Sequence, residues 1–348
     1  MSEKVIVELG DRSYEILIGS GIRELAKQSD LLVTDSNVDK YYGSWAETKA
    51  NCKYIFPAGE ENKSIQTVAD ICRAAAQNRL SRKSVMTALG GGVCGDMTGF
   101  AAAIYMRGID FVQIPTTLLA MVDSSVGGKT AVDIPEGKNL IGAFHQPRQV
   151  LIDTDFLKTL PLKEIRCGLA EIIKTGVILD ENLFAELEKA SETLTTAPDY
   201  ERYSSIIRRC CELKAQVVAA DEKEGGLRAI LNYGHTFGHA FELLSNFTLS
   251  HGEGVALGMC AAGEYAAAEG IWSKQEALQQ KKLIAALGLP TRLDTAYKTG
   301  DVIQAMLGDK KSASGKINLV LPTRIGHAEI FKDAAAGKIA LAVESIYA

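Results

Sequence analysis

The 348 residues are too many for one small core and fit two domains of ordinary size, and 47% apolar with 23% charged residues is typical of a globular protein. The formal net charge of −5, without a basic stripe or lysine-rich tail, excludes the electrostatic footprint of a nucleic-acid-binding protein. Residues 1–19 lack the apolar region of a signal peptide, and no stretch approaches the roughly 20 apolar residues of a membrane span, so we expect neither a nucleic-acid nor a membrane partner.

The first part of the chain alternates short apolar runs with helical patterns. Candidate strands cover residues 4–9, 14–18, 31–35, 53–56, 85–90, 110–114 and 149–153. Between the fourth and fifth of these, residues 64–78 place Ile65, Val68 and Cys72 on one helical face. Because this alternation is typical of a parallel layer, we expect an α/β, Rossmann-like dinucleotide-binding domain over residues 1–158.

The pattern changes near Pro161, after which almost every segment has a helical period. Candidate helices cover residues 162–179, 181–190, 200–220, 236–245, 252–269 and 273–287, and a short strand is expected at 317–322. We therefore expect an all-α C-terminal domain over residues 159–348.

Seven cysteines are scattered along the chain and form no Cys-x-x-Cys pair. They are Cys52, Cys72, Cys94, Cys167, Cys210, Cys211 and Cys260. An odd, scattered set disfavours a disulfide framework or a thiolate metal site, so we expect reduced thiols in a cytoplasmic protein.

A glycine-rich turn, Gly90-Gly-Gly-Val-Cys-Gly95, follows the strand predicted at 85–90 and has the spacing G-x-G-x-x-G. Glycines let backbone N–H groups approach a pyrophosphate, and the start of the next helix favours negative charge. A turn with only a packing role fits the same spacing. For the ribose we prefer Asp35, at the carboxyl end of an earlier strand, over Asp110, which starts a strand.

A second polar loop, residues 115–130, follows the strand predicted at 110–114. Its Thr116, Thr117, Asp123 and Lys129 suit oxyanion or phosphate contacts, although the spacing is not that of a P-loop. An ordinary turn with a solvated lysine is the alternative. The density of polar groups at a strand exit favours a functional loop.

Three of the five histidines fall in one short window. His235 and His239 are four residues apart, so a helix shows both on one face, and His251 opens the next helix. Glu171, one turn before Lys174, offers a carboxylate. Two imidazoles and a carboxylate with an open position describe a catalytic zinc-type site, and hydrogen-bonded structural histidines are the alternative.

Basic residues beside glycine, asparagine or aspartate recur along the chain. They are Arg107, Lys129, Lys138, Lys214, Arg228, Lys310 and Lys311. Each alone reads as a solvated surface charge. Together with a metal and a nucleotide site, they would suit a substrate that carries both phosphate and carboxylate.

Taken in order, these segments resemble one family, the 3-dehydroquinate synthases among the sugar phosphate cyclases. The matching strings lie at residues 90–96, 99–103, 105–108, 115–120, 123–132, 137–147, 168–174, 231–240, 251–253 and 309–311. The resemblance runs from about Asp35 to Lys311, nearly the whole chain. One departure is Asp133, which stands where the family leads us to expect asparagine.

The resemblance implies a role for many residues. The implied ligands of one divalent metal, zinc or cobalt, are Glu171, His235 and His251. The implied NAD contacts are Asp35, Glu60, Lys63, Gly91, Gly92, Val93, Asp96, Thr116, Thr117, Asp123, Lys129 and Lys138. The implied catalytic residues are Asp123, Lys129, Lys174, Asn232 and His239. The implied substrate contacts are Arg107, Lys129, Lys138, Asn139, Lys214, Arg228, Asn232, His239 and Lys310.

The resemblance also implies the reaction. A 3-deoxy-D-arabino-heptulosonate 7-phosphate would become 3-dehydroquinate and phosphate, in the shikimate pathway, by oxidation with NAD, phosphate elimination, re-reduction and aldol closure. It further implies a homodimer, with Arg107 reaching a neighbouring subunit. The alternatives are an inosose- or valiolone-forming cyclase, a metal-dependent polyol dehydrogenase and a non-catalytic sensor. Lys214 and Arg228, as a clamp for a carboxylate, argue against the other cyclases.

Overall fold

The computed structural model describes residues 3–196, 199–308 and 316–347. By its internal contacts the chain forms two compact units, Met1–Glu164 with Tyr200–Lys223, and Ile165–Asp199 with Glu224–Ala348. Residues 200–223 thus pack with the first unit, although the sequence-based division placed them in the second. The division into domains at residues 158 and 159 stays a prediction, and each unit is considered by itself.

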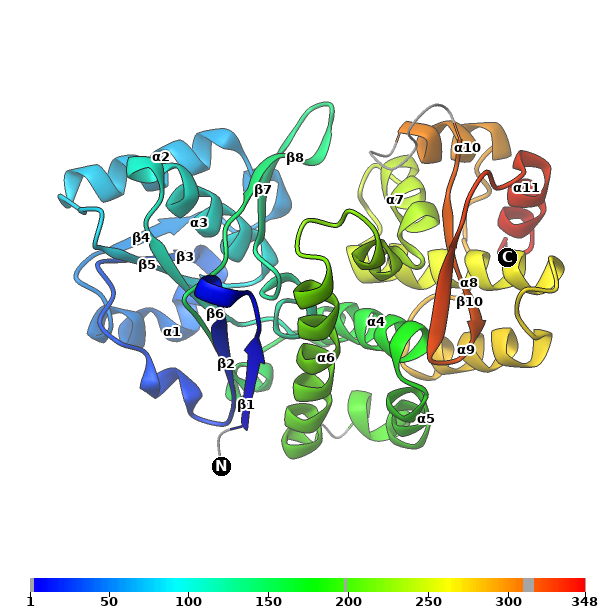
Figure 1. Ribbon diagram of the computed structural model, residues 1–348, viewed down its shortest axis with the longest axis horizontal. Coiled ribbons are helices and arrows are strands. Elements are labelled where there is room, and N and C mark those ends of the chain that lie inside the picture. The colour runs from blue at the N-terminus through cyan, green and yellow to red at the C-terminus, as the bar shows by residue number, and fades with distance from the viewer. Residues whose placement is uncertain (1–2, 197–198, 309–315, 348) are drawn as a thin grey trace. The chain divides into compact units, whose positions relative to one another are not determined.

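A seven-stranded sheet forms the centre of the first unit (Figure 1). Its strands are β1 (Glu3–Val7), β2 (Tyr14–Gly19), β3 (Leu31–Asp35), β4 (Lys53–Phe56), β5 (Val85–Gly90), β6 (Asp110–Pro115) and β9 (Gln149–Asp153). The spatial order is β1-β2-β9-β6-β5-β3-β4, parallel except for the β1–β2 pair. The seven strands of this sheet correspond to the seven strands predicted in this part of the chain.

Helices cover the sheet because their apolar faces bury against its β-branched and aromatic residues. They are α1 (Ser36–Thr48), α2 (Ile65–Gln77), α3 (Gly92–Ile104) and α6 (Tyr200–Ala220). One core cluster joins Val68 of α2 and Met97 of α3 to Val33, Met86 and Phe111 of the strands. Helix α6 packs against β1 and β2, so an element distant in sequence completes this unit.

A β-hairpin that the sequence did not predict follows the second polar loop. Its strands are β7 (Lys129–Ile134) and β8 (Gly137–Phe144), which pair antiparallel and extend beyond the sheet (Figure 1). Strand β7 packs on α3, while Leu140, Ile141 and Phe144 of β8 are exposed.

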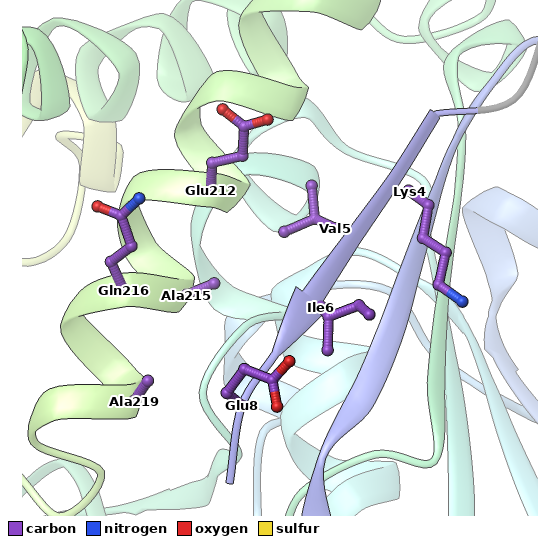
Figure 2. A pocket seen from close by; sticks show the side chains of 8 residues that line it. All are labelled: Lys4, Val5, Ile6, Glu8, Glu212, Ala215, Gln216 and Ala219. Carbon is purple, nitrogen blue, oxygen red and sulfur yellow. The ribbon is translucent and has the colours of Figure 1, made fainter.

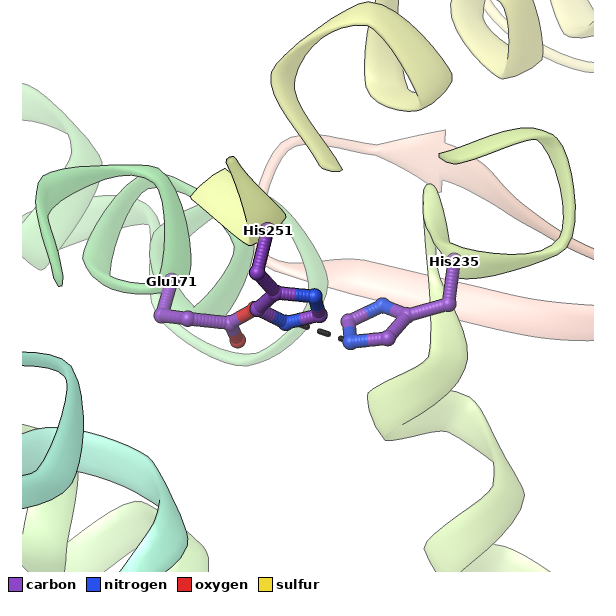
Figure 3. A group of neighbouring side chains, drawn as sticks. All are labelled: Glu171, His235 and His251. Carbon is purple, nitrogen blue, oxygen red and sulfur yellow. Dashed lines mark ion pairs between the residues drawn. The ribbon is translucent and has the colours of Figure 1, made fainter. Parts of the chain in front are cut away.

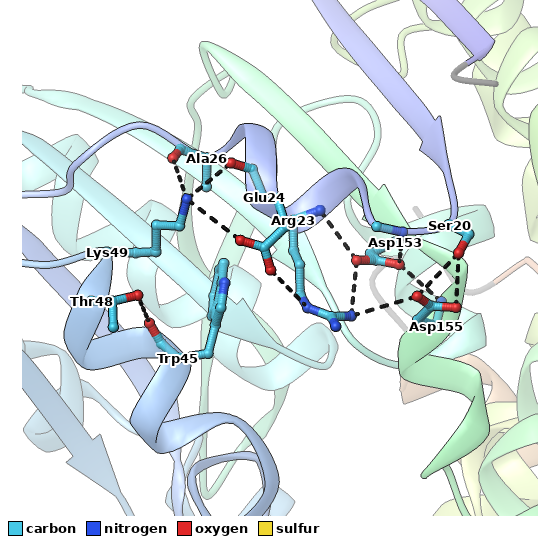
Figure 4. A network of polar contacts seen from close by, with 10 residues as sticks. Ser20, Arg23, Glu24, Ala26, Trp45, Thr48, Lys49, Asp153 and Asp155 are labelled. Atoms are coloured by element: carbon cyan, nitrogen blue, oxygen red, sulfur yellow. Dashed lines mark hydrogen bonds and ion pairs between the residues drawn. The ribbon is translucent and has the colours of Figure 1, made fainter.

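The buried carboxylate of Asp153 ties the end of β9 to the loop after β2 (Figure 4). It accepts hydrogen bonds from the backbone N–H groups of Gly21 at 3.0 Å and Arg23 at 3.2 Å, and from the Arg23 guanidinium at 3.0 Å. The same guanidinium lies 5.5 Å from the ring centroid of Phe156. A charge this deep in the protein is tolerated because several donors satisfy it.

The second unit is mainly helical. It contains most of α4 (Leu162–Leu179), with α5 (Glu181–Thr196), α7 (His235–Leu244), α8 (His251–Ala268), α9 (Lys274–Ala286), α10 (Thr299–Gly308) and α11 (Ala336–Glu344). A hairpin of β10 (Leu319–Arg324) and β11 (His327–Phe331) also belongs to it. The predicted fold class, an α/β unit followed by a helical part, is confirmed. No helix in the described ranges is both long and apolar enough to cross a membrane.

Glycines bring α7 and α8 unusually close together. A Cβ atom at Gly258 would lie 1.9 Å from the carbonyl oxygen of Gly234, and one at Gly238 would lie 2.7 Å from that of Gly254. Gly234, just before α7, also has a left-handed φ of 77°, which favours glycine. These four glycines form a seam that no larger residue can enter.

A groove of about 300 Å³ lies between β1 and α6 (Figure 2). Val5, Ala215 and Ala219 contribute apolar side chains, while Lys4 and Glu212 are among its charged ones. None of the residues that line it is among the predicted site residues, so it is separate from the predicted chemistry.

Candidate functional site

Three side chains from three helices of the second unit converge on one point (Figure 3). Glu171 lies inside α4, whereas His235 and His251 are the first residues of α7 and α8. Their ligand atoms all lie within 4.8 Å of one another. The Nε2 atoms of His235 and His251 are 3.6 Å and 3.4 Å from Oε1 of Glu171.

The donor set fits a divalent metal. A tetrahedral zinc ion with bonds of about 2.0 to 2.1 Å separates its ligand atoms by about 3.3 Å, close to the observed distances. Glu171 is 1% exposed, and neither of its oxygens accepts a well-aligned hydrogen bond from a described residue. A buried carboxylate in this condition is stabilised by a cation.

Charge in the site also favours a cation. Burial alone would raise the pKa of Glu171, but the ammonium of Lys174 and then His251 outweigh burial and lower this pKa to about 2. Lys174 pairs with Oε2 of Glu171, which leaves Oε1 directed at the imidazoles. Burial lowers the pKa of His251, yet Glu171 and Glu242 raise it to about 10. Two carboxylates therefore favour a positive charge at this imidazole.

Each imidazole makes a polar contact through Nδ1, the ring nitrogen that does not face Glu171. Nδ1 of His235 lies 3.0 Å from the carbonyl oxygen of Tyr233, and Nδ1 of His251 lies 3.0 Å from Oε1 of Glu242. Both rings consequently present Nε2 to Glu171. His239 lies beside this trio, with its ring centroid 5.4 Å from that of His235 and 6.2 Å from that of His251. With Glu242 and His251 it forms a second group of possible cation ligands.

Two other predicted site residues lie in the segment that precedes α7 in the chain. Arg228 is 1% exposed in a 3₁₀ segment, Leu227–Asn232, and Asn232 donates from Nδ2 to Oε1 of Glu224 at 2.8 Å. Lys310, with its neighbour Lys311, lies outside the described residues.

In the first unit, the glycine-rich turn joins β5 to α3, with Gly91 as the N-cap. A Cβ atom at Gly91 would lie 3.0 Å from Thr117, and one at Gly90 would lie 3.4 Å from Oδ2 of Asp35. The N–H of Thr116 donates to the carbonyl of Gly90 at 2.9 Å. The structure thus brings the two predicted polar segments and Asp35 together at one edge of the sheet, as the carboxyl ends of parallel strands require.

Asp35 caps a helix in addition to making its predicted ribose contact. Its Oδ1 accepts from the backbone N–H groups of Asn37 at 2.8 Å and Val38 at 3.1 Å, so it caps α1. The other predicted nucleotide contacts in this area are Gly92, whose added Cβ would meet Ser124, and the half-buried Val93 at the start of α3.

A buried lysine organises the next part of the first unit. Lys63 donates from Nζ to Asp96 at 2.7 Å and to Asn139 at 2.6 Å. Although burial opposes it, Asp96 and Glu60 raise the pKa of Lys63. The carboxylate of Asp133 accepts from the N–H of Asn139 at 2.7 Å, a bond that an asparagine oxygen could also accept, so this departure preserves the local geometry.

Asp123 and Lys214 form one pair rather than two separate contacts. Nζ of Lys214 donates to the carbonyl and carboxylate oxygens of Asp123, both at 2.6 Å. Asp123 lies in a π-helical segment, Ala120–Ser124, a geometry often found at functional sites. Lys214 belongs to the first unit and its predicted clamp partner Arg228 to the second.

The remaining predicted residues of the first unit lie on the hairpin or before β6. Lys129 is exposed at the start of β7, and Lys138 is half-buried on β8. Arg107 is exposed with a left-handed φ of 69°, directly after Met106 with φ of 48°. Two consecutive non-glycine residues with left-handed backbone conformation indicate a strained turn.

Sequence reasoning missed Glu242, which contacts His251, and Cys167, which contacts the backbone of the residue after His251. Glu242 is buried behind His251, and Sγ of Cys167 accepts from the N–H of Gly252 at 3.0 Å. A signal for Glu242 was available. It lies seven residues after His235 and three after His239, on the same helical face, as the one acid in an otherwise apolar helix end.

Comparisons with known proteins identify the family of the chain. Residues 53–167 match the family described as 3-dehydroquinate synthase N-terminal, and residues 168–312 match the family 3-dehydroquinate synthase C-terminal. The chain is 50% identical over 350 residues to a 3-dehydroquinate synthase of Nostoc punctiforme (strain ATCC 29133 / PCC 73102), with 94% of each chain covered.

Solved structures share the fold over almost the whole chain. One is 2-epi-5-epi-valiolone synthase from Streptomyces hygroscopicus subsp. jinggangensis 5008 with NAD+ and Zn2+ bound, at TM-score 0.90 and 27% identity, covering 97% of this chain and 98% of that one. Another, 2-deoxy-scyllo-inosose synthase complexed with carbaglucose-6-phosphate, NAD+ and Co2+, has TM-score 0.87 and 23% identity over 99% and 100% of the chains, and shows the fold alone. The resemblance found in the sequence is confirmed: the chain belongs to the 3-dehydroquinate synthase family.

Proposed function

We propose that this chain converts 3-deoxy-D-arabino-heptulosonate 7-phosphate to 3-dehydroquinate and phosphate, through oxidation, phosphate elimination, re-reduction and aldol closure. Its family consists of phosphate-eliminating lyases of the shikimate pathway that use NAD and a divalent metal. The structural observation that carries the proposal is the buried Glu171 facing His235 and His251. Family membership also sets aside the polyol dehydrogenase alternative.

Glu171, His235 and His251 would hold the metal, zinc or cobalt. When bound, the metal supplies a Lewis acid at a substrate hydroxyl and NAD supplies reversible hydride acceptance. Lys174 neutralises the second oxygen of Glu171, which keeps this carboxylate in one orientation. The protein's own contribution is to fix the reacting groups, because correct orientation can remove several kcal/mol from a barrier.

The nucleotide would bind at the edge of the sheet where β3, β5 and β6 end. Backbone N–H groups at the start of α3 are suited to a pyrophosphate, since a helix N-terminus attracts anions and the glycines allow close approach. Asp35 would accept from the ribose hydroxyls through Oδ2, because Oδ1 already caps α1. Glu60, Lys63, Asp96, Thr116 and Thr117 would complete the site, with contributions from Val93, Asp123, Lys129 and Lys138.

The substrate requires positive charge at both ends. Arg228 and Lys214 would bind its carboxylate, Lys129, Asn139, Asn232, His239 and Lys310 would bind its phosphate, and Lys138 would be a further substrate contact. Asp123, Lys174 and Asn232 would contact the hydroxyls. Burial of Arg228 supports its role, because a dry guanidinium binds a carboxylate in two parallel hydrogen bonds more strongly than an exposed one.

A homodimer with Arg107 reaching the neighbouring subunit is part of the proposal. Exposed Ile104 and Met106 lie beside Arg107 and would be covered by a second chain. Light scattering on the purified protein should give twice the chain mass of 37.4 kDa. A cytoplasmic location fits the seven cysteines, all in described segments and none in a disulfide.

Phosphate release from the heptulosonate phosphate tests the function. The purified protein is assayed with catalytic NAD and zinc, with and without EDTA, and the product is identified by NMR. We expect EDTA-sensitive release of one phosphate per dehydroquinate, without NADH accumulation. No turnover by folded protein loaded with zinc and NAD would contradict the proposed substrate, and the inosose- and valiolone-type substrates would then be assayed.

A further inference from the structure

The side chain of Glu242 contacts a predicted metal ligand from the side opposite the metal. Glu242 lies on α7, is 2% exposed, and places Oε1 at 3.0 Å from Nδ1 of His251. The implied ligand set and the predicted substrate and NAD contacts do not include it.

This contact determines which nitrogen of His251 carries the proton. An ionised carboxylate only accepts hydrogen bonds, so Nδ1 of His251 must be the donor. When a metal replaces the other ring proton, Nε2 would offer the lone pair, and it is Nε2 that lies 3.4 Å from Oε1 of Glu171. Glu242 thereby presents the ligating nitrogen to the metal position.

The two imidazoles of the trio differ in this respect. Nδ1 of His235 faces a neutral backbone carbonyl, that of Tyr233, at 3.0 Å. Nδ1 of His251 faces a buried carboxylate at the same distance. A ring whose Nδ1–H faces a charged acceptor gives more electron density to a metal than a ring whose Nδ1–H faces a neutral one. His251 should therefore be the stronger metal ligand of the two.

Packing holds Glu242 in this orientation. A Cβ atom at Gly254 would lie 2.8 Å from Cγ and 2.9 Å from Oε1 of Glu242, so only glycine leaves room for the side chain. Gly252 plays a matching role beside Cys167, whose Cα atom would be 2.4 Å from an added Cβ. The two glycines that follow His251 each make room for a residue that supports its position.

A second reading of the same atoms is a cation shared by His239, Glu242 and His251, which also form a possible ligand group. A cation there would have to replace the Nδ1 proton of His251. The 3.0 Å contact and the deep burial of Glu242 favour a direct hydrogen bond instead. The two readings differ in the number of metal ions bound per chain.

We propose that Glu242 is a positioning residue that fixes the tautomer of His251 and strengthens it as a metal ligand. The inference rests on the proposed function, in which Glu171, His235 and His251 hold the metal. It adds a carboxylate that touches neither substrate nor metal.

Metal affinity of the full-length protein tests the proposal. Wild type, Glu242→Ala, Glu242→Gln and the control Glu253→Ala are stripped of metal, and zinc affinity is measured by competition with a chromophoric chelator. Glu253 lies in the first turn of α8, the helix that begins at His251, and caps this helix by accepting from the backbone N–H of Ser250 at 2.8 Å. Its loss should lower the melting temperature without weakening zinc binding. Absorption spectra of the cobalt-loaded proteins report the geometry of the metal.

We expect Glu242→Ala to weaken zinc binding by about 10- to 100-fold. Glu242→Gln should weaken it less, because its amide oxygen can still accept from Nδ1, and the cobalt spectra of both variants should shift. Wild-type affinity and an unchanged cobalt spectrum in Glu242→Gln and in folded Glu242→Ala would overturn the proposal. Two zinc ions per wild-type chain, with one lost in Glu242→Ala, would also overturn it. Failure of wild type to bind zinc would instead contradict the proposed function.

Discussion

In the first unit the buried ammonium of Lys63 donates to Asp96 and Asn139, whereas in the second unit Glu171 pairs through Oε2 with Lys174 and directs Oε1 at His235 and His251. The first arrangement is complete in the protein itself. In the second, Oε1 of Glu171 and the Nε2 atoms of two imidazoles converge on one position, which a metal ion would occupy. The difference teaches that the α/β unit should be ordered without its ligand, while the metal-type trio should depend on one.

The largest effect should follow from removing the charge at the trio. Glu171→Gln keeps the side-chain shape but loses the carboxylate, so zinc should be lost and the rate of phosphate release should fall by about 10³-fold or more, the equivalent of several kcal/mol of Lewis-acid stabilisation. Elemental analysis after dialysis and the phosphate assay measure the two losses. Asp96→Asn, in the other unit, is the matched control and should retain its zinc. Stoichiometric zinc in Glu171→Gln would mean that zinc binding does not need the Glu171 carboxylate, and the second unit would then not depend on a metal in the way proposed.

Metal removal should separate the two units more directly. A hundredfold excess of metal over its dissociation constant stabilises the folded state by about 2.7 kcal/mol. Hydrogen exchange with and without EDTA should show this protection on α4, α7 and α8, which carry the trio, and little change on β3, β5 and β6. Equal changes in both groups of peptides would show that the units do not differ in their dependence on metal.

A smaller effect, on the free energy of unfolding, is expected at Asp153, whose buried carboxylate is compensated by hydrogen bonds within the first unit. Asp153→Asn weakens the charge-assisted hydrogen bonds to Gly21 and Arg23, and should lower the free energy of unfolding by about 2 kcal/mol. Urea denaturation of the metal-free protein measures it. Asp155→Asn, which changes a more exposed carboxylate nearby, should have less effect. An unchanged midpoint for Asp153→Asn would mean that the network is not stabilising.

The smallest effect concerns a surface ion pair of the first unit. The Arg12 guanidinium lowers the pKa of Glu222, so this pair stabilises the folded state above the usual glutamate pKa and loses that contribution as the pH falls through the lowered value. Arg12→Gln should therefore show a weaker loss of stability than wild type as the pH falls from about 5 to 3. Urea denaturation of metal-free protein across this range provides the comparison, and parallel curves for the two proteins would argue against the pair.

Much of the fold could be predicted because apolar residues recur at regular spacings and polar or glycine residues mark the ends of the elements. Strands β3, β4, β5 and β9 have the predicted bounds, since each is a short apolar run between polar or glycine residues. The hairpin β7–β8 was not predicted, because its exposed Leu140, Ile141 and Phe144 do not alternate with polar residues as a half-buried strand would. The helix α6 was predicted, but not its packing with the first unit, which depends on contacts across 200 residues of chain.

For the site, residue types carried the prediction further than spacing did. The i, i+4 pair of His235 and His239 pointed to a shared metal, yet the structure places His235 with His251 and Glu171, a grouping that only the family resemblance implied. Helical spacing cannot tell which of two histidines on one face meets a third element. Glu242 escaped notice for the same reason, because its partner His251 begins a different helix.

The seam of Gly234, Gly238, Gly254 and Gly258 has a consequence for how this architecture can change. Because backbone meets backbone between α7 and α8, the separation of His235 from His251 does not depend on the size of any side chain between them. Substitutions at residues predicted to face a substrate could then accumulate without shifting this pair of predicted ligands. Such separation of the predicted metal site from the predicted recognition residues would make a scaffold evolvable, and structures of this fold bear the names of synthases of different products.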